Sequence, residues 1–174
     1  MTDEVDYDAP DHCTVGVIGE VGHRLFLFYC RQGLTETTVK VEKQQVAVLA
    51  SYLGRIVKEL GRPGHLPDDL SFDGTEDPEW VVGTIGVSYD EELDRVVVVL
   101  EEVAEEEEDE DEDGEESSGH VLRIALTREQ AAAFAIHATR MVEAGRPPCP
   151  LCGLPLDPSG HDCPRTNGHR PPVT

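Results

Sequence analysis

An internal repeat is the feature of this sequence that most restricts its fold. The segment TVGVIG at residues 14–19 recurs as VVGTIG at residues 81–86. Residues 37–60 align without a gap to residues 122–145, at a constant offset of 85. Between these matches, each copy has a run of β-branched or aromatic residues that is typical of a strand. Because the matches recur in the same order, they predict one β-β-β-α unit that occurs twice.

Each unit is predicted to end in an amphipathic helix. The second helix has a clear start, because Thr127 and Gln130 have the spacing of a capping box. Apolar residues recur at steps of three and four, namely Val46, Leu49, Leu53, Ile56, Val57 and Leu60, and then Ala131, Phe134, Ala138, Met141 and Val142. We therefore expect the α+β class, with six mainly antiparallel strands in one sheet under two helices, related by approximate two-fold symmetry.

The repeat also divides the chain. We predict the first unit over residues 13–60, a linker rich in Pro, Gly and Asp over 61–79, the second unit over 80–145 and a tail over 146–174. The second unit carries an acidic insertion at 101–119, which we expect to be disordered because its charges repel one another and bury no apolar surface. Its role is open between solvation and docking to a basic partner surface.

The first hairpin has a register that can be predicted from its turn. If the turn is centred on Val21 and Gly22, Cys13 lies directly opposite Cys30 across the ladder. The same register determines the faces of Val15, Val17, Phe26 and Phe28. We expect the two thiols to touch as buried residues without a redox role. We also expect Trp80, at the start of the second unit, to fill the core.

Charge limits the possible partners. The chain has 36 acidic and 14 basic residues, a formal net charge of -22. A groove for phosphates needs clustered Lys and Arg, so nucleic-acid binding is disfavoured. The N-terminus is acidic and the apolar runs are shorter than a membrane span, which argues against a signal peptide and a membrane protein. We place the protein in the cytoplasm.

The strongest chemical motif lies in the tail. Cys149-x-x-Cys152-Gly is followed by Gly-His161-Asp-Cys163-Pro, so two short turns offer three thiolates and an imidazole. Cys149, Cys152, His161 and Cys163 are typical of a Cys3His zinc site, and four protein ligands make the zinc structural. His169 is the alternative fourth ligand. A catalytic zinc with three thiolates and a water is disfavoured, because the chain lacks the His-x-Glu motif of the deaminases.

Four stretches of the sequence resemble a known family. They are PDHCTVGVIGEVGHR near the start, EKQQV at the first helix, WVVGTIG at the second unit and CPLCGLPLDPSGHDCPR near the end. Together they resemble the actinobacterial proteins grouped as domain of unknown function 3090, over nearly the whole length. The resemblance implies no reaction. The long acidic insertion departs from the compact pattern of that family.

Two functions are compatible with these features. The sequence has no Walker loop, no G-x-S-x-G elbow and no evident catalytic dyad. We therefore expect a non-enzymatic interaction or adaptor protein with a protein partner whose identity is open. The alternative is a small-ligand-binding protein or an enzyme that uses a pocket between the two units. The basic residues around the tail, Arg146, Arg165, His169 and Arg170, would receive an acidic partner.

Overall fold

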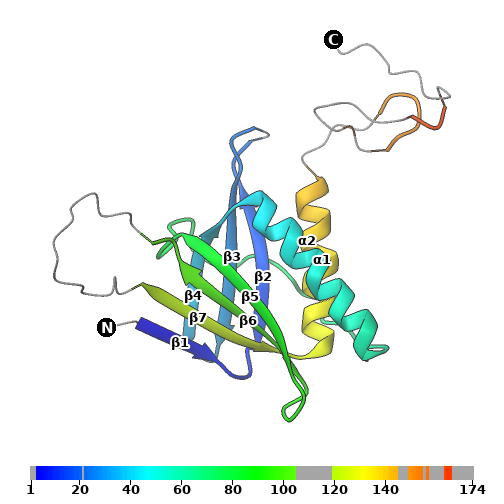
Figure 1. Cartoon of the computed structure of the whole chain (residues 1–174). Helices are drawn as coiled ribbons and strands as arrows, with labels where there is room; N and C mark the ends of the chain where they lie inside the picture. Colours follow the sequence, from blue (N-terminus) through cyan, green and yellow to red (C-terminus); the bar gives the residue numbers. More distant parts are fainter. Residues whose placement is uncertain are drawn as a thin grey trace.

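The protein, seen in a computed structural model, is a mixed α+β structure (Figure 1). The structure describes residues 3–20, 22–104, 119–144, 149–154, 156 and 163–165. Its elements, in chain order, are β1 (Asp3–Tyr7), β2 (His12–Ile18), β3 (Leu25–Gln32), β4 (Thr35–Val41), α1 (Lys43–Leu60), β5 (Val82–Asp90), β6 (Arg95–Glu102), β7 (His120–Leu126) and α2 (Arg128–Glu143). After β1, the order strand, strand, strand, helix occurs twice. The predicted disordered insertion lies largely outside the described residues.

The strands form two sheets, so the predicted single six-stranded sheet is wrong. One sheet has the order β1-β7-β6-β5, and the other has the order β2-β3-β4. The additional strand, β1, lies parallel to β7, with Tyr7 beside Ile124. The remaining pairs within the sheets are antiparallel. The sequence of β1, DEVDY, did not predict a strand because it is mostly acidic, and Val5 and Tyr7 are the residues that reach the core.

The two sheets meet where β4 passes the start of β5. Lys40 forms a parallel bridge with Val81, and its backbone N–H donates to the Trp80 carbonyl at 2.9 Å. Trp80 is 7% exposed, and its ring stacks on that of His120 at 6.1 Å between centroids. The prediction that Trp80 fills the core is therefore confirmed, and its place is the junction of the two sheets.

The first hairpin has the predicted register. Cys13 pairs with Cys30 and Val15 with Phe28 in the antiparallel ladder of β2 and β3. Both thiols are buried and free, and burial with the neighbouring Cys30 raises the pKa of Cys13 well above its ordinary value. Val15 and Phe28 lie in the core, as do Cys13 and Cys30. The predicted adjacency is confirmed, and the absence of a redox role stays a prediction.

The two helices pack against each other and close one core between the sheets. Each begins with a capping box, at Glu42 and Gln45 for α1 and at Thr127 and Gln130 for α2. α2 lies between α1 and β2, and its many alanines permit this close approach. One connected set of buried side chains includes residues from both sheets and both helices. No helix in the described part of the chain is long and apolar enough to cross a lipid bilayer.

Residues 69–75, which we call the strap, cover the outer face of the β2-β3-β4 sheet. Thr14 Oγ1 donates to the Leu70 carbonyl at 2.7 Å, and His12 Nε2 donates to the Ser71 carbonyl at 2.7 Å. The ring of Phe72 packs edge-on against Tyr29, with centroids 5.8 Å apart. The predicted linker over 61–79 has no helix or strand, and part of it serves as a cover for this sheet.

Gly16→Ala should destabilise the protein, because the strap leaves no room for a side chain there. A Cβ at Gly16 would lie 2.4 Å from Cγ of Phe72. We expect the free energy of unfolding to fall by about 1–3 kcal/mol, the usual cost of overpacking, as measured by urea denaturation. Gly86→Ala is the matched control in β5, since its Cβ would lie 3.9 Å from that of Val99. Equal effects of the two substitutions would show that Phe72 does not close over Gly16.

Candidate metal centre

A tight turn positions the first two cysteines of the tail. The Cys149 N–H donates to the Leu154 carbonyl at 2.7 Å, and the Gly153 N–H donates to the Cys149 carbonyl at 2.8 Å. Gly153 has a φ of 74°, a left-handed conformation that glycine adopts without a steric penalty. The sequence Cys-x-x-Cys-Gly therefore folds locally into the turn that the motif predicts.

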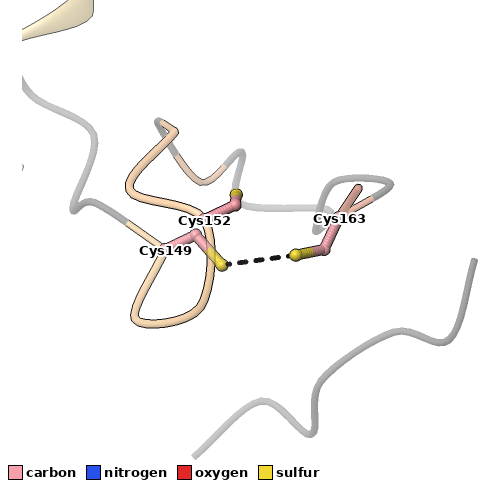
Figure 2. Close-up of side chains that lie close together, drawn as sticks. All are labelled: Cys149, Cys152 and Cys163. Atoms are coloured by element: carbon pink, nitrogen blue, oxygen red, sulfur yellow. Dashed lines mark hydrogen bonds between the residues drawn. The ribbon is translucent and has the colours of Figure 1, made fainter. Parts of the chain in front are cut away.

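The third cysteine lies against this turn. The sulfur atoms of Cys149, Cys152 and Cys163 all lie within 4.8 Å of one another. Figure 2 shows the Cys149 and Cys163 sulfurs pointing toward each other, at a distance of 4.0 Å. Cys149 and Cys163 are each 2% exposed, and Cys152 is half-buried.

The pKa values of the two thiols of the turn are shifted in opposite directions. Burial raises the pKa of Cys149, but backbone N–H groups of Cys152 and Leu151 and the two neighbouring thiols outweigh it, and the net pKa is below the ordinary value. Burial raises the pKa of Cys152 above its ordinary value, although the Leu154 N–H opposes this. N–H groups aimed at sulfur stabilise a thiolate, which is the form that binds metal.

These three sulfurs can hold a metal ion. Four ligands at zinc–sulfur bond lengths would place neighbouring sulfurs about 3.8 Å apart, close to the separation seen between Cys149 and Cys163. Thiolates favour soft ions such as zinc and disfavour magnesium or calcium. The structure thus brings together three of the four predicted ligands. The fourth, His161, lies outside the described residues, as does its alternative His169.

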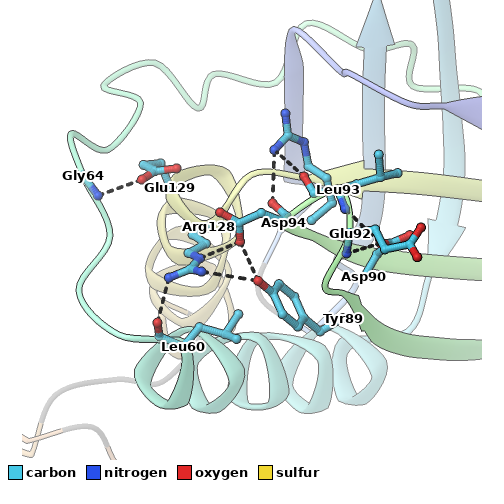
Figure 3. A network of polar contacts seen from close by, with 10 residues as sticks. Leu60, Gly64, Tyr89, Asp90, Glu92, Leu93, Asp94, Arg128 and Glu129 are labelled. Carbon is cyan, nitrogen blue, oxygen red and sulfur yellow. Dashed lines mark hydrogen bonds and ion pairs between the residues drawn. The ribbon is translucent and has the colours of Figure 1, made fainter.

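A polar network at the other end of the helices was missed by sequence reasoning (Figure 3). Arg128 donates to Asp94 at 2.8 Å and to the Leu60 carbonyl at 2.7 Å, and Tyr89 donates to Asp94 at 2.6 Å. The hydrogen bonds from Tyr89 and Arg128 lower the pKa of Asp94. Arg128 therefore ties the start of α2 to the last turn of α1 and to the β5–β6 turn. A cation in the first turn of a helix is unfavourable, because it opposes the helix dipole. The position of Arg128 at the start of α2 was therefore the one signal in the sequence that this side chain has a specific partner.

The predicted alternative function needs a pocket between the two units, and an open groove lies there. It is located between α1 and β5 and has a volume of 410 Å³. Its lining is Gln44, Gln45, Val48, Leu49, Tyr52, Gly83, Ile85 and Val87. Among these residues Tyr52 is the single titratable side chain. The groove therefore offers apolar surface and amides, which suit docking better than acid–base chemistry.

Fold and site together define a mixed α+β protein with a cluster of three cysteines that can bind a metal. The chain belongs to the family described as protein of unknown function DUF3090, whose model matches residues 5–163. The match runs from β1 to Cys163, so it includes all three clustered cysteines. No match was found among curated proteins, and none among solved structures.

Proposed function

We propose that this chain is a non-enzymatic adaptor whose C-terminal tail is organised by one structural zinc ion. Cys149, Cys152, His161 and Cys163 hold the ion in this proposal. The observation that carries it is the approach of three sulfurs to within 4.8 Å of one another on a turn with N–H groups directed at sulfur. With four protein ligands, zinc has no open position for water or substrate and therefore acts structurally.

In the same proposal, the body is a duplicated platform for protein partners. The repeated order of three strands and a helix supports a duplication, with units over residues 13–60 and 80–145, the linker 61–79 between them, the insertion at 101–119 and the zinc tail over 146–174. We place the protein in the reducing cytoplasm, where cysteines stay available as thiolate ligands for a metal.

Zinc content and partner capture test this function together. We expect about one zinc per purified chain by elemental analysis, and loss of zinc from Cys149→Ser and Cys163→Ser. Cys30→Ser, which changes a buried cysteine of the body, is the matched control and should keep zinc. Affinity capture from the source cells should recover a stoichiometric protein with the wild type and lose it with Cys163→Ser.

Two outcomes would contradict the proposal. A metal-free chain with an intact tail would reject the zinc site. Recovery of a small molecule that the protein converts, without a protein partner, would favour the enzyme that uses the groove between α1 and β5.

A further inference from the structure

The strand β5 presents a free backbone edge. It pairs with β6 on one side, and it is the end strand of the four-stranded sheet. On its other side, Gln45 Nε2 donates to the Val82 and Gly83 carbonyls at 3.1 Å each. Beyond Gly83, no strand in the described part of the chain pairs with this edge. The sequence VGTIGVSYD also has no Lys or Pro, the residues with which proteins usually protect an edge strand.

An apolar groove runs beside this edge. Figure 1 shows α1 alongside β5, and the groove of 410 Å³ lies between them. On its helix side, Val48 is 59% exposed and Tyr52 is 40% exposed. These residues are four apart on α1, so they share one face of the helix. On its strand side, Ile85 and Val87 are half-buried on one face of β5. The groove therefore combines unpaired backbone groups with exposed apolar side chains.

Such a combination selects an extended peptide. Backbone N–H and C=O groups at a strand edge are satisfied by another strand that runs along it. In an added strand every second side chain points to the same face, so alternate apolar residues would contact Val48, Tyr52, Ile85 and Val87. A globular surface or a small ligand would leave most of the edge unpaired.

Charge at both ends of the groove defines the flanks of that peptide. Where β5 ends, Asp90 is followed by the exposed Glu91 and Glu92. Where β5 begins, the exposed Glu42 precedes α1 and forms an ion pair with Lys40 at 3.9 Å. Glu102, on the paired side of β5, accepts a hydrogen bond from the His120 N–H. Four bases lie near these five acids, namely Lys40, Lys43, Arg95 opposite Asp90, and Arg55 over the Tyr52 ring at 4.6 Å, so the acids exceed the bases by one. With a net charge of -22, a second copy of the chain would be repelled, whereas a segment with Lys or Arg at both ends would be attracted.

We propose that the groove between α1 and β5 binds an extended segment of a partner protein by strand addition. The segment has alternating apolar residues at its centre and basic residues at both ends. This inference rests on the proposed adaptor function and adds a second partner class to it, a segment that contacts the body and does not require the zinc tail.

A synthetic peptide tests the proposal directly. The probe is KKVTISVKK with a fluorescent label, titrated with the full chain and followed by anisotropy. Saturable binding is expected, with NMR shifts that map to Val48, Tyr52 and the residues from Thr84 to Tyr89. The peptide EEVTISVEE should bind at least about tenfold more weakly, since four attractive charges become repulsive. The peptide KKVTPSVKK should also bind at least about tenfold more weakly, because proline interrupts the strand.

Two variants of the chain localise the binding. Val48→Lys removes apolar surface and repels the basic probe, and its exposure makes the substitution compatible with folding, as circular dichroism should show. It should weaken binding at least about tenfold. Leu34→Lys is the matched control, because Leu34 is fully exposed in the turn between β3 and β4, away from the groove. It should bind the probe as the wild type does.

Several results would overturn the proposal. They are the absence of probe binding, equal binding of the three peptides, insensitivity to Val48→Lys, or NMR shifts confined to other residues. A dimer in sedimentation that Val48→Lys dissociates would make a second copy the occupant. Loss of probe binding alone, with partner capture still dependent on Cys163, would reject this groove and leave the adaptor function standing. Probe binding without any captured partner would support this groove and contradict the proposed adaptor function.

Discussion

Removing zinc with a chelator should unfold the turn at Cys149–Leu154 and leave the rest of the fold intact. The connected core of the described residues ends at Val142 and includes neither Cys149 nor Cys163. The burial of these cysteines therefore depends on their mutual contact, which the metal would maintain. Structural zinc in small sites contributes about 10–16 kcal/mol to folding, so the tail without it has little to keep it ordered.

Hydrogen exchange and fluorescence measure the two parts separately. Amide protection at Leu151–Leu154 should vanish with chelator and return when zinc is added back. The fluorescence of Trp80, the single tryptophan, should not change, because it lies at the junction of the two sheets. Cys30→Ser should behave as the wild type does. Protection that survives complete removal of the metal would contradict the site, and a simultaneous change at Trp80 would contradict the independence of the tail.

The parts of the fold that depend on local pattern were predictable from the sequence. The register of the first hairpin depends on its turn, so Cys13 could be placed opposite Cys30. The start of α2 depends on Thr127 and Gln130, which form the predicted capping box. In the hairpin the paired residues are connected by one reverse turn, and in the capping box they are three residues apart. Tertiary contacts therefore change neither the register of the hairpin nor the start of the helix.

The sheet arrangement was not predictable in the same way. β1 pairs with β7, more than a hundred residues away, and its acidic sequence gives no strand pattern. The two sheets stay separate because, among the described residues, β4 meets the start of β5 through a single bridge, between Lys40 and Val81, across α1 and the following linker. Local sequence patterns do not determine which distant strands pair. The predicted number and order of strands were therefore wrong, although the predicted α+β class was confirmed.

The same contrast holds for the candidate sites. The cysteines of the turn are three residues apart and fold locally, and their spacing predicted the cluster with Cys163. The groove between α1 and β5 is formed by residues such as Val48 and Ile85 that come together only through the tertiary fold. Neither segment has a motif by itself. The groove can bind a partner because the tertiary fold places an unpaired strand edge and an exposed helix face side by side.

Phe134→Ala should cause a large loss of stability of the whole body in a single transition. Phe134 in α2 is 1% exposed, and its ring lies 5.4 Å from that of Phe28 in β3, between centroids. Truncation of a buried Phe leaves a cavity and costs about 3–5 kcal/mol, a large fraction of the stability of an ordinary domain. Ile136→Ala on the same helix is the matched control. Its side chain is 46% exposed, so a change within about 0.5 kcal/mol is expected.

The form of the transition tests whether the two predicted units are one folding unit. Phe28 belongs to the first unit and Phe134 to the second, and both lie in the same connected core. Urea unfolding followed by Trp80 fluorescence and by far-ultraviolet circular dichroism should therefore coincide, in the wild type and in Phe134→Ala. Separate transitions would mean that the units fold independently and that their contact is an interface between domains. Coincident transitions shifted to lower urea would mean that neither unit is stable without the other, because each buries its apolar face against its neighbour.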